Sequence, residues 1–140
     1  MYLLDTNVVS ELRKATRAEP NVRVWASGHS PDLFHLSTMT LMELEIGVLG
    51  IERRDKPQGD RLRHWLQQVV VAQFDGRIIA IDADIARACA KLHVPDPRPE
   101  RDALIAATAL VHGLTVVTRN TADFEPMGVA VLNPWLSPGA

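Results

Sequence analysis

The sequence lacks several features that would mark a specialised class of protein. It holds one cysteine, Cys89, in 140 residues, so it cannot form an internal disulfide, and a lone cysteine is typical of a reducing compartment. No apolar run approaches the length of a membrane span, and no basic-then-apolar leader precedes the first predicted strand. These absences favour a cytoplasmic protein with no membrane partner.

An excess of charge of one sign is also lacking, because the formal net charge is −2. The chain has no global field to attract nucleic acid, so any polyanion must be bound by a local patch. It has no glycine-rich phosphate loop and no nucleophile elbow, and its five histidines lack zinc-ligand spacing. What remains is an ordinary globular composition, 46% hydrophobic and 23% charged, over a length that predicts one domain, residues 1–140.

Short apolar runs alternate with segments of helical periodicity along the chain. Strands are predicted at residues 2–4, 34–37, 78–81, 114–117 and 129–132. Helices are predicted after a cap at Asn7, from Pro20, from Thr40, after a cap at Asp60, from Asp82 to about Leu92, and from Pro99 to His112. The polar stretch 53–61 is predicted to be a loop. This alternation predicts an α/β fold with a parallel sheet and right-handed crossovers.

Four acidic residues stand where a predicted strand ends or a helix begins. Asp5, Glu43 and Asp123 follow predicted strands, whereas Asp102 begins the helix that leads into the fourth strand. Because the carboxyl ends of parallel strands meet at one edge of a sheet, we expect these side chains to converge. Grouped carboxylates repel one another unless cations hold them, which favours a hard divalent metal such as Mg²⁺ or Mn²⁺.

Each acid also has a purely structural interpretation, as part of a helix cap. Asp5 can cap the following helix, and Glu43 can complete a capping box with Thr40. Asp102 suits a first helical turn, and Asp123 can cap a short turn. A capping residue could equally be Ser, Thr or Asn, yet all four positions carry an acid. We therefore favour a shared metal site over four independent caps.

Such a site would support hydrolysis of a phosphodiester, because a carboxylate-bound metal polarises a phosphate and lowers the pKa of a bound water. A haloacid-dehalogenase-like phosphatase is an alternative, but it needs an Asp and a Thr where the sequence has Asn7 and Val9. A receiver domain would need a lysine after a late strand, where Arg119 and Asn120 stand. A non-catalytic module that binds protein or nucleic acid is a further alternative.

A family resemblance is carried by four segments: LLDTNVVSE, LMELEIGV, RDALIAATALVHGLTVVTRNTADFE and the closing VAVLNPW. Together they resemble PIN-domain proteins, and more narrowly the VapC/FitB-like toxins of bacterial type II toxin–antitoxin pairs. The resemblance implies a three-layer α/β/α fold with a central, mostly parallel sheet of about five strands. It also implies an endoribonuclease that depends on Mg²⁺ or Mn²⁺, pairs as a homodimer and is neutralised by a cognate antitoxin.

The resemblance assigns roles to individual residues. Asp5, Glu43 and Asp102 fall on the family's three central acids, and Asp123 falls on a more variable fourth. All four are implied to be catalytic, and the three aspartates to ligate the metal. The implied supporting residues are polar neighbours of these acids: Thr6, Asn7, Thr118 and Asn120.

RNA binding would need cations for phosphates, and often aromatic rings for bases. Arg119 is the best-placed candidate, because it follows a strand between two candidate site residues. Trp25 and Trp65 have helical core spacing and are predicted to pack, whereas Trp135 could pack on the sheet or on another protomer. The remaining candidate cations are predicted mostly to be solvated surface: Arg53, Arg54, Lys56, Arg61, Arg63, Arg98 and Arg101.

Two predicted helices carry more apolar side chains than one small sheet needs. This surplus favours contacts with a second copy of the chain and with an amphipathic antitoxin helix. The residues concerned are Val8, Val9, Leu12, Leu41, Leu44 and Val48.

Overall fold

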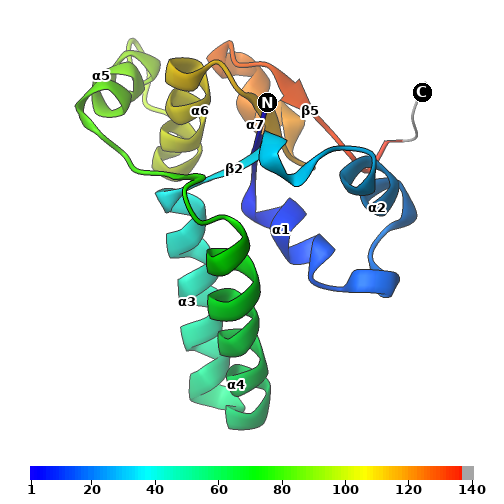
Figure 1. The fold of residues 1–140 in the computed structure, drawn as a ribbon. Coiled ribbons are helices and arrows are strands. Elements are labelled where there is room, and N and C mark those ends of the chain that lie inside the picture. The colour runs from blue at the N-terminus through cyan, green and yellow to red at the C-terminus, as the bar shows by residue number, and fades with distance from the viewer. Residues whose placement is uncertain (137–140) are drawn as a thin grey trace.

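The computed structural model describes residues 1–136. Within them, five short parallel strands form one sheet in the order β3-β2-β1-β4-β5 (Figure 1). This confirms the predicted α/β class with a parallel sheet of about five strands. The strands are β1 (Tyr2–Leu4), β2 (Phe34–Ser37), β3 (Ile78–Ile79), β4 (Thr115–Val117) and β5 (Val131–Leu132).

The side-chain alternation of the central strands creates a core on each face of the sheet. Leu3 and Val116 pack in one core, whereas their neighbours Leu4 and Val117 pack in the other. All four are almost fully buried, as expected for parallel strands covered on both faces. The fold is therefore a three-layer α/β/α arrangement, as the resemblance implied.

Seven α-helices lie between these strands within residues 1–136. Helices α5 and α6 contribute to the core that contains Leu3, and α1 and α3 to the core that contains Leu4. None of the described helices is long and apolar enough to cross a membrane. The helices are α1 (Thr6–Leu12), α2 (Pro20–Ser27), α3 (Thr38–Arg54), α4 (Lys56–Trp65), α5 (Ala83–Leu92), α6 (Glu100–His112) and α7 (Thr121–Phe124).

Helices α3 and α4 form an arm that projects from the body of the molecule (Figure 1). The prediction of a loop over 53–61 was therefore wrong: α3 runs to Arg54, and Asp55, not Asp60, caps α4 by accepting a hydrogen bond from Gln58 N at 3.2 Å. Helix α4 continues directly into a π-helical segment, η3 (Leu66–Val71). Arg63 joins the two helices, donating to Glu45 at 2.5 Å and to Glu52 at 2.9 and 3.2 Å.

Several predicted helix ends need correction. Asp5, not Asn7, caps α1, and Ser37, not Thr40, caps α3 by accepting from Met39 N at 3.0 Å. The predicted start of a helix at Asp82 is confirmed, since Asp82 accepts from Ile85 N, and the helix predicted to end at His112 is followed by Gly113 with a left-handed φ of 65°. The third and fifth strands are shorter than predicted.

The predicted apolar surplus was wrong for the named residues of α3, and on α1 it holds only for Val9 and Leu12, which line an apolar groove. Val8, Val9, Leu44 and Val48 are buried within the chain's own core, and Leu12 and Leu41 pack against it. The exposed apolar side chains of α3 are instead Met42, Ile46 and Leu49.

Candidate metal centre

Asp5 lies at the carboxyl end of the central strand β1, next to the end of β4. Its backbone N–H donates to the carbonyl of Val117 at 2.9 Å, which extends the parallel pairing by one residue. Its carboxylate accepts from Thr6 N at 2.8 Å and from the hydroxyl of Thr118 at 2.8 Å. Asp5 is 7% exposed. It therefore caps α1 and also presents a buried carboxylate at the sheet edge.

The hydroxyl of Thr118 makes three of the hydrogen bonds around Asp5. Besides donating to Asp5, it accepts from Asn7 Nδ2 at 3.3 Å and from Asn120 N at 3.0 Å. Asn7 Oδ1 in turn accepts from the backbone N–H of Arg119 at 3.3 Å. Because a hydroxyl has one proton and two lone pairs, Thr118 is fully satisfied and its orientation is fixed. The predicted supporting residues thus lie together around Asp5.

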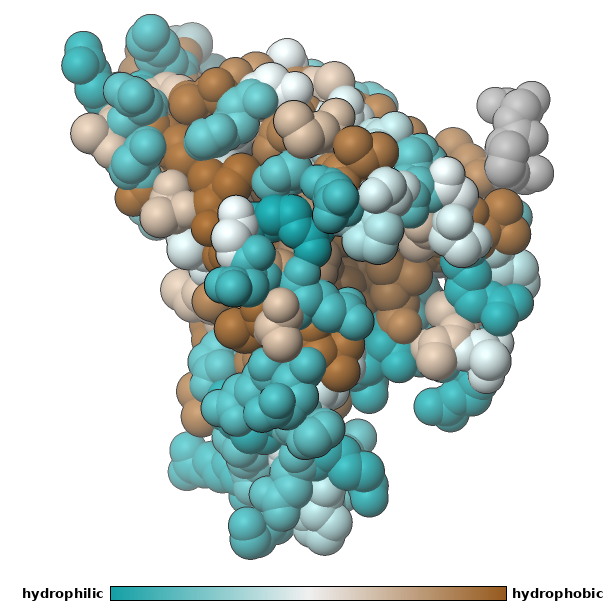
Figure 2. Space-filling model, viewed as in Figure 1, coloured by the Kyte–Doolittle hydropathy of each residue, from teal (hydrophilic) through white to brown (hydrophobic). Residues whose placement is uncertain are grey.

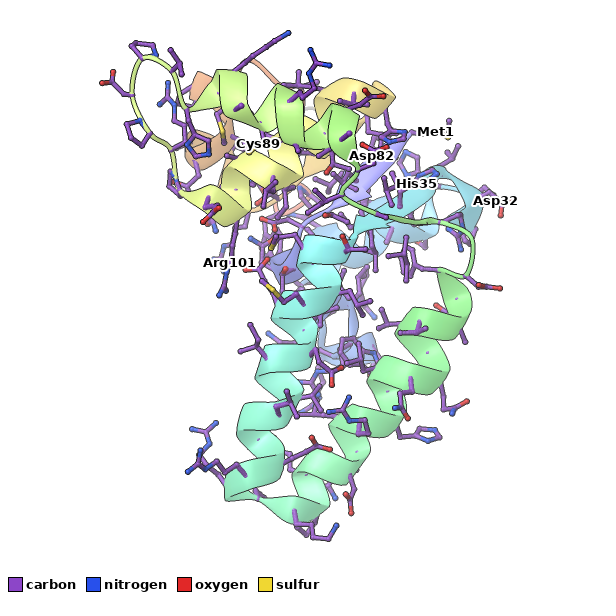
Figure 3. All side chains as sticks on the ribbon, turned by 90° about the vertical axis from the view of Figure 1, so that its left-hand side faces the viewer. Met1, Asp32, His35, Asp82, Cys89 and Arg101 are labelled. Carbon is purple, nitrogen blue, oxygen red and sulfur yellow. The ribbon has the colours of Figure 1, made fainter. Side chains whose placement is uncertain are left out.

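Glu43 reaches the same region from α3. Its Oε1 accepts from the hydroxyl of Thr6 at 2.9 Å, and its Oε2 lies 3.8 Å from Nη1 of Arg101. Figure 3 shows Arg101 beside the N-terminal end of α3. The capping-box interpretation of Glu43 is therefore wrong. Among the described residues, the buried hydroxyl of Thr40 has no hydrogen-bond partner at all.

Asp102 and Asp123 complete the acidic cluster, defined here as Asp5, Glu43, Asp102 and Asp123. Asp102 lies in the first turn of α6 and Asp123 in α7, whose N-cap position is Asn120. Burial raises the pKa of Asp102, and the charges of Asp5, Asp123 and Glu43 raise it further. Helices far apart in the sequence therefore bring these four carboxylates within electrostatic reach of one another.

Burial is also the main cause of a raised pKa at Asp5. The hydrogen bonds from Thr118 and Thr6 oppose this effect, while the charges of Glu43 and Asp123 add to it. A carboxylate that is held ionised at this position costs free energy unless a cation compensates it. The cluster thus carries negative charge. Within residues 1–136, its one ion pair is that of Glu43 with Arg101 at 3.8 Å.

The donors of the cluster fit a hard divalent cation, because they are carboxylate oxygens surrounded by hydroxyl and amide groups. No three acidic, histidine or cysteine side chains in residues 1–136 are gathered tightly enough to form a ready-made metal site. The fit to a cation therefore rests on the chemistry of these donors.

The predicted cations occupy different environments. The guanidinium of Arg119 lies over the ring of Trp135, 5.3 Å from its centre, and Trp135 packs against the core beside the sheet. Arg53, Arg54 and Lys56 are exposed at the tip of the arm, and Arg98 is exposed near α6. Trp25 packs with Tyr2, His29 and Phe34, as core spacing predicted.

Two arginines that the sequence did not single out, Arg13 and Arg17, lie near Arg61 and Trp65. They stand just after α1, and no motif marks them. Only the fold reveals that they face the arm.

The raised pKa values predict how the metal-free protein responds to pH. A folded carboxyl with a raised pKa holds its proton more tightly than the unfolded chain does. Its stabilising effect is therefore complete below the ordinary Asp value of 3.8 and is lost as the pH rises through the raised folded value. We expect Asp102→Asn to flatten this loss and to leave metal-free stability at neutral pH equal or higher.

Urea unfolding in EDTA across the acid range checks this, with Asp84→Asn, an exposed first-turn residue of α5, as the charge-matched control. A clear loss of stability in Asp102→Asn at neutral pH would show instead that Asp102 mainly stabilises the start of α6.

The fold and the site define a parallel α/β protein with an acidic cluster at the carboxyl edge of its sheet. The chain belongs to the PIN-domain family, whose model matches residues 2–128. It is 39% identical over 143 residues to Toxin FitB of Neisseria gonorrhoeae, covering 96% of this chain and 99% of that protein. It is 35% identical over 145 residues to VapC ribonuclease Y4jK of Sinorhizobium fredii, covering 96% and 98%.

A solved structure has a similar fold. The crystal structure of FitAcB from Neisseria gonorrhoeae matches with a TM-score of 0.88 at 34% identity, covering 96% of this chain and 99% of that one. The family resemblance predicted from the sequence is therefore confirmed. PIN-domain ribonucleases generally need a divalent metal ion, which agrees with the chemistry of the acidic cluster.

Proposed function

We propose that this chain is an endoribonuclease that hydrolyses RNA phosphodiesters and acts as the toxin of a type II toxin–antitoxin pair. The observation that carries the proposal is the acidic cluster, held at the sheet edge of a PIN domain. Relatives that align over almost the whole chain are named VapC ribonuclease and Toxin FitB. We take residues 1–140 to form one such domain.

Asp5, Asp102 and Asp123 are the proposed ligands of Mg²⁺, with Mn²⁺ as a substitute. A divalent ion bound there would polarise the scissile phosphate and acidify a nearby water. Glu43, held by the hydroxyl of Thr6, is the proposed general base that accepts the proton of the attacking water. Thr118 and Asn7 keep the carboxylate of Asp5 in one orientation. Asn120 fixes Thr118 from the other side.

A non-catalytic binding module is the second candidate function. The charge of the cluster alone would suit it, because an arginine of a partner could occupy the acids without any chemistry. Metal-dependent RNA cleavage separates the two candidates. The phosphatase alternative is not retained, since the chain belongs to the PIN-domain family and lacks the second acid of that motif at Asn7.

A partner surface lies next to the cluster. An apolar groove of about 460 Å³ runs between α1 and the arm, with Leu4, Val9 and Phe34 on one side and Trp65 and Val70 on the other. Figure 2 shows hydrophobic residues in the hollow beside the arm, whose tip is hydrophilic. We propose that an amphipathic antitoxin helix lies here and sends a basic side chain to the acidic cluster. We also propose that the toxin pairs as a homodimer.

Co-expression tests the toxin assignment. The gene beside this one should encode a small antitoxin, and the purified complex should show RNase activity at least about tenfold below that of the free chain, because a basic side chain in the cluster competes with metal. Activity is measured on the complex and on the chain freed from it. A neighbouring small protein that neither binds nor inhibits would leave a free-standing PIN nuclease.

A further inference from the structure

A second cleft, separate from the acidic cluster, opens between the end of α1 and the arm. It has a volume of about 420 Å³ and is lined by Arg13, Arg17, Gln58, Arg61, Leu62 and Trp65. We call it the arginine cleft. The arginines come from two distant parts of the chain. Arg13 is the C-cap of α1 and Arg17 ends the short 3₁₀ turn η1 (Ala15–Arg17), whereas Arg61 lies in α4.

The three arginines line one cleft and form no ion pair within residues 1–136. None of the ion pairs within residues 1–136 includes Arg13, Arg17 or Arg61, and no carboxylate in that part of the chain lines the cleft. Arg63, two residues from Arg61 on the same helix, is by contrast paired with Glu45 and Glu52. Gathered positive charges without counter-charge form an anion-binding site.

The turn that presents two of these arginines is conformationally strained. Ala15, between Arg13 and Arg17, has a φ of 53°, and it is the one non-glycine residue with positive φ among residues 1–136. An alanine is disfavoured in this left-handed region. Strained backbone of this kind is concentrated at functional sites. The left-handed residue turns the chain between Arg13 and Arg17, which both line the cleft.

Trp65 packs against the core, as its helical spacing predicted, and the rest of its ring lines the same cleft. The guanidinium of Arg13 lies over its ring, 5.8 Å from the centre. Planar guanidinium groups and indole rings are the side chains on which unpaired bases stack. An acidic protein segment would use the arginines but would gain nothing from the ring face, so nucleic acid is the better match.

The arginine cleft and the acidic cluster lie at opposite ends of α1. Asp5 caps the start of α1 and Arg13 stands at its end, so the two positions are about 12 Å apart along the helix axis. A strand of RNA that is bound in the cleft can therefore continue along α1 to the carboxylates. Because the net charge of the chain is negative, such a local patch is needed to hold a polyanion.

We infer that the arginine cleft binds the phosphates of single-stranded RNA, with one base beside Trp65 and the Arg13 guanidinium that lies over it, and leads the strand to the acidic cluster. This inference rests on the proposed ribonuclease function and names the surface that holds its substrate. Arg13 and Trp65 also line the apolar groove. An antitoxin helix in that groove therefore covers part of the RNA site as well as the acids.

The test is binding of a short, labelled, unstructured oligoadenylate to the full chain in EDTA, measured over a range of salt concentrations. The variant carries Arg13→Gln, Arg17→Gln and Arg61→Gln. The control carries the same loss of charge at exposed positions elsewhere, Arg53→Gln, Arg54→Gln and Arg98→Gln. Loss of three phosphate contacts should reduce the slope of log affinity against log salt by about two, while the control keeps the wild-type slope.

Equal losses in variant and control would overturn the inference, since only general charge would then matter. Unchanged RNA binding together with lost antitoxin binding would assign the cleft to an acidic protein segment instead. If RNA binding depends on the cleft but the RNA is never cut in the presence of Mg²⁺, the ribonuclease proposal fails and the RNA-binding role of the cleft stands. If the triple variant cuts RNA with the wild-type kcat/KM, the RNA-binding role of the cleft is refuted and the ribonuclease proposal stands. Thermal melts confirm that each variant is folded.

Discussion

Replacement of Asp5 by Asn is expected to lower Mg²⁺-dependent RNA cleavage by about 10²-fold or more, which is the range for loss of a group that acts at the reacting centre. Asp5 is the most buried acid of the cluster, and it is the acid whose orientation is fixed by two hydrogen bonds. An amide there removes a negative charge and one metal-ligating oxygen. The measurement is the initial rate of cleavage of a defined RNA with and without Mg²⁺.

Asp84→Asn is the matched control, because it removes the same charge from an exposed position on α5. It should keep wild-type activity. Mg²⁺ at ten times its Kd should stabilise wild type and this control by about 1.4 kcal/mol, and should stabilise Asp5→Asn much less. Cleavage that survives in Asp5→Asn would move the chemistry away from the cluster or reveal a contaminating nuclease.

The hydrogen bonds of Asp5 add a stability cost to this substitution. Thr118 already accepts from Asn7 and Asn120, so its hydroxyl can only donate toward residue 5. An asparagine side chain has one oxygen and one NH₂ group. Its NH₂ group must therefore point at either this hydroxyl or the N–H of Thr6, both of which are donors, and one hydrogen bond is lost. We therefore expect this lost hydrogen bond to cost about 1 kcal/mol, which offsets the stability gained in the metal-free protein by removing a buried charge. Activity must be assayed well below the melting temperature.

The sheet and the acidic cluster could be predicted from the sequence because each depends on local signals. Apolar runs locate the strands, and the geometry of a parallel sheet then brings Asp5 and the end of β4 to the same edge. The contacts around Thr118 could not be predicted, since they join residues 5–7 to residues 118–120 through side-chain orientation. The same holds for Arg13 and Arg17, whose neighbour Arg61 is on the arm.

Helix caps were predicted less well, because two polar residues that lie close together in the sequence both match the pattern of an N-cap. Thr40 and Glu43 have the spacing of a capping box, yet Ser37 lies at the strand end and begins the helix earlier. The arm was missed for a related reason. Pro57 and Gly59 favour a loop by composition, but Pro57 lies in the first turn of α4, where proline is tolerated.

Gly59 has a different role, which leads to a prediction about the stability of the arm. It is buried in α4, and a Cβ placed there would lie 2.5 Å from Glu52 Cα and 2.9 Å from Glu52 N. The close approach of α4 to α3 therefore requires glycine. Gly59→Ala is expected to lower the free energy of unfolding by about 2–3 kcal/mol, as overpacking against backbone does, although alanine is the better helix former by about 1 kcal/mol.

Gly50→Ala is the control, because it lies in α3 with nothing within 4 Å of an added Cβ. Helix propensity acts alone there, so it should raise the free energy of unfolding by up to about 1 kcal/mol. Urea unfolding of both variants measures the difference, and opposite signs are expected. If both stabilised the protein equally, the two helices would not be in such close contact at Gly59. The bonds from Arg63 to Glu45 and Glu52 and the packing of Leu62 would then hold the arm together.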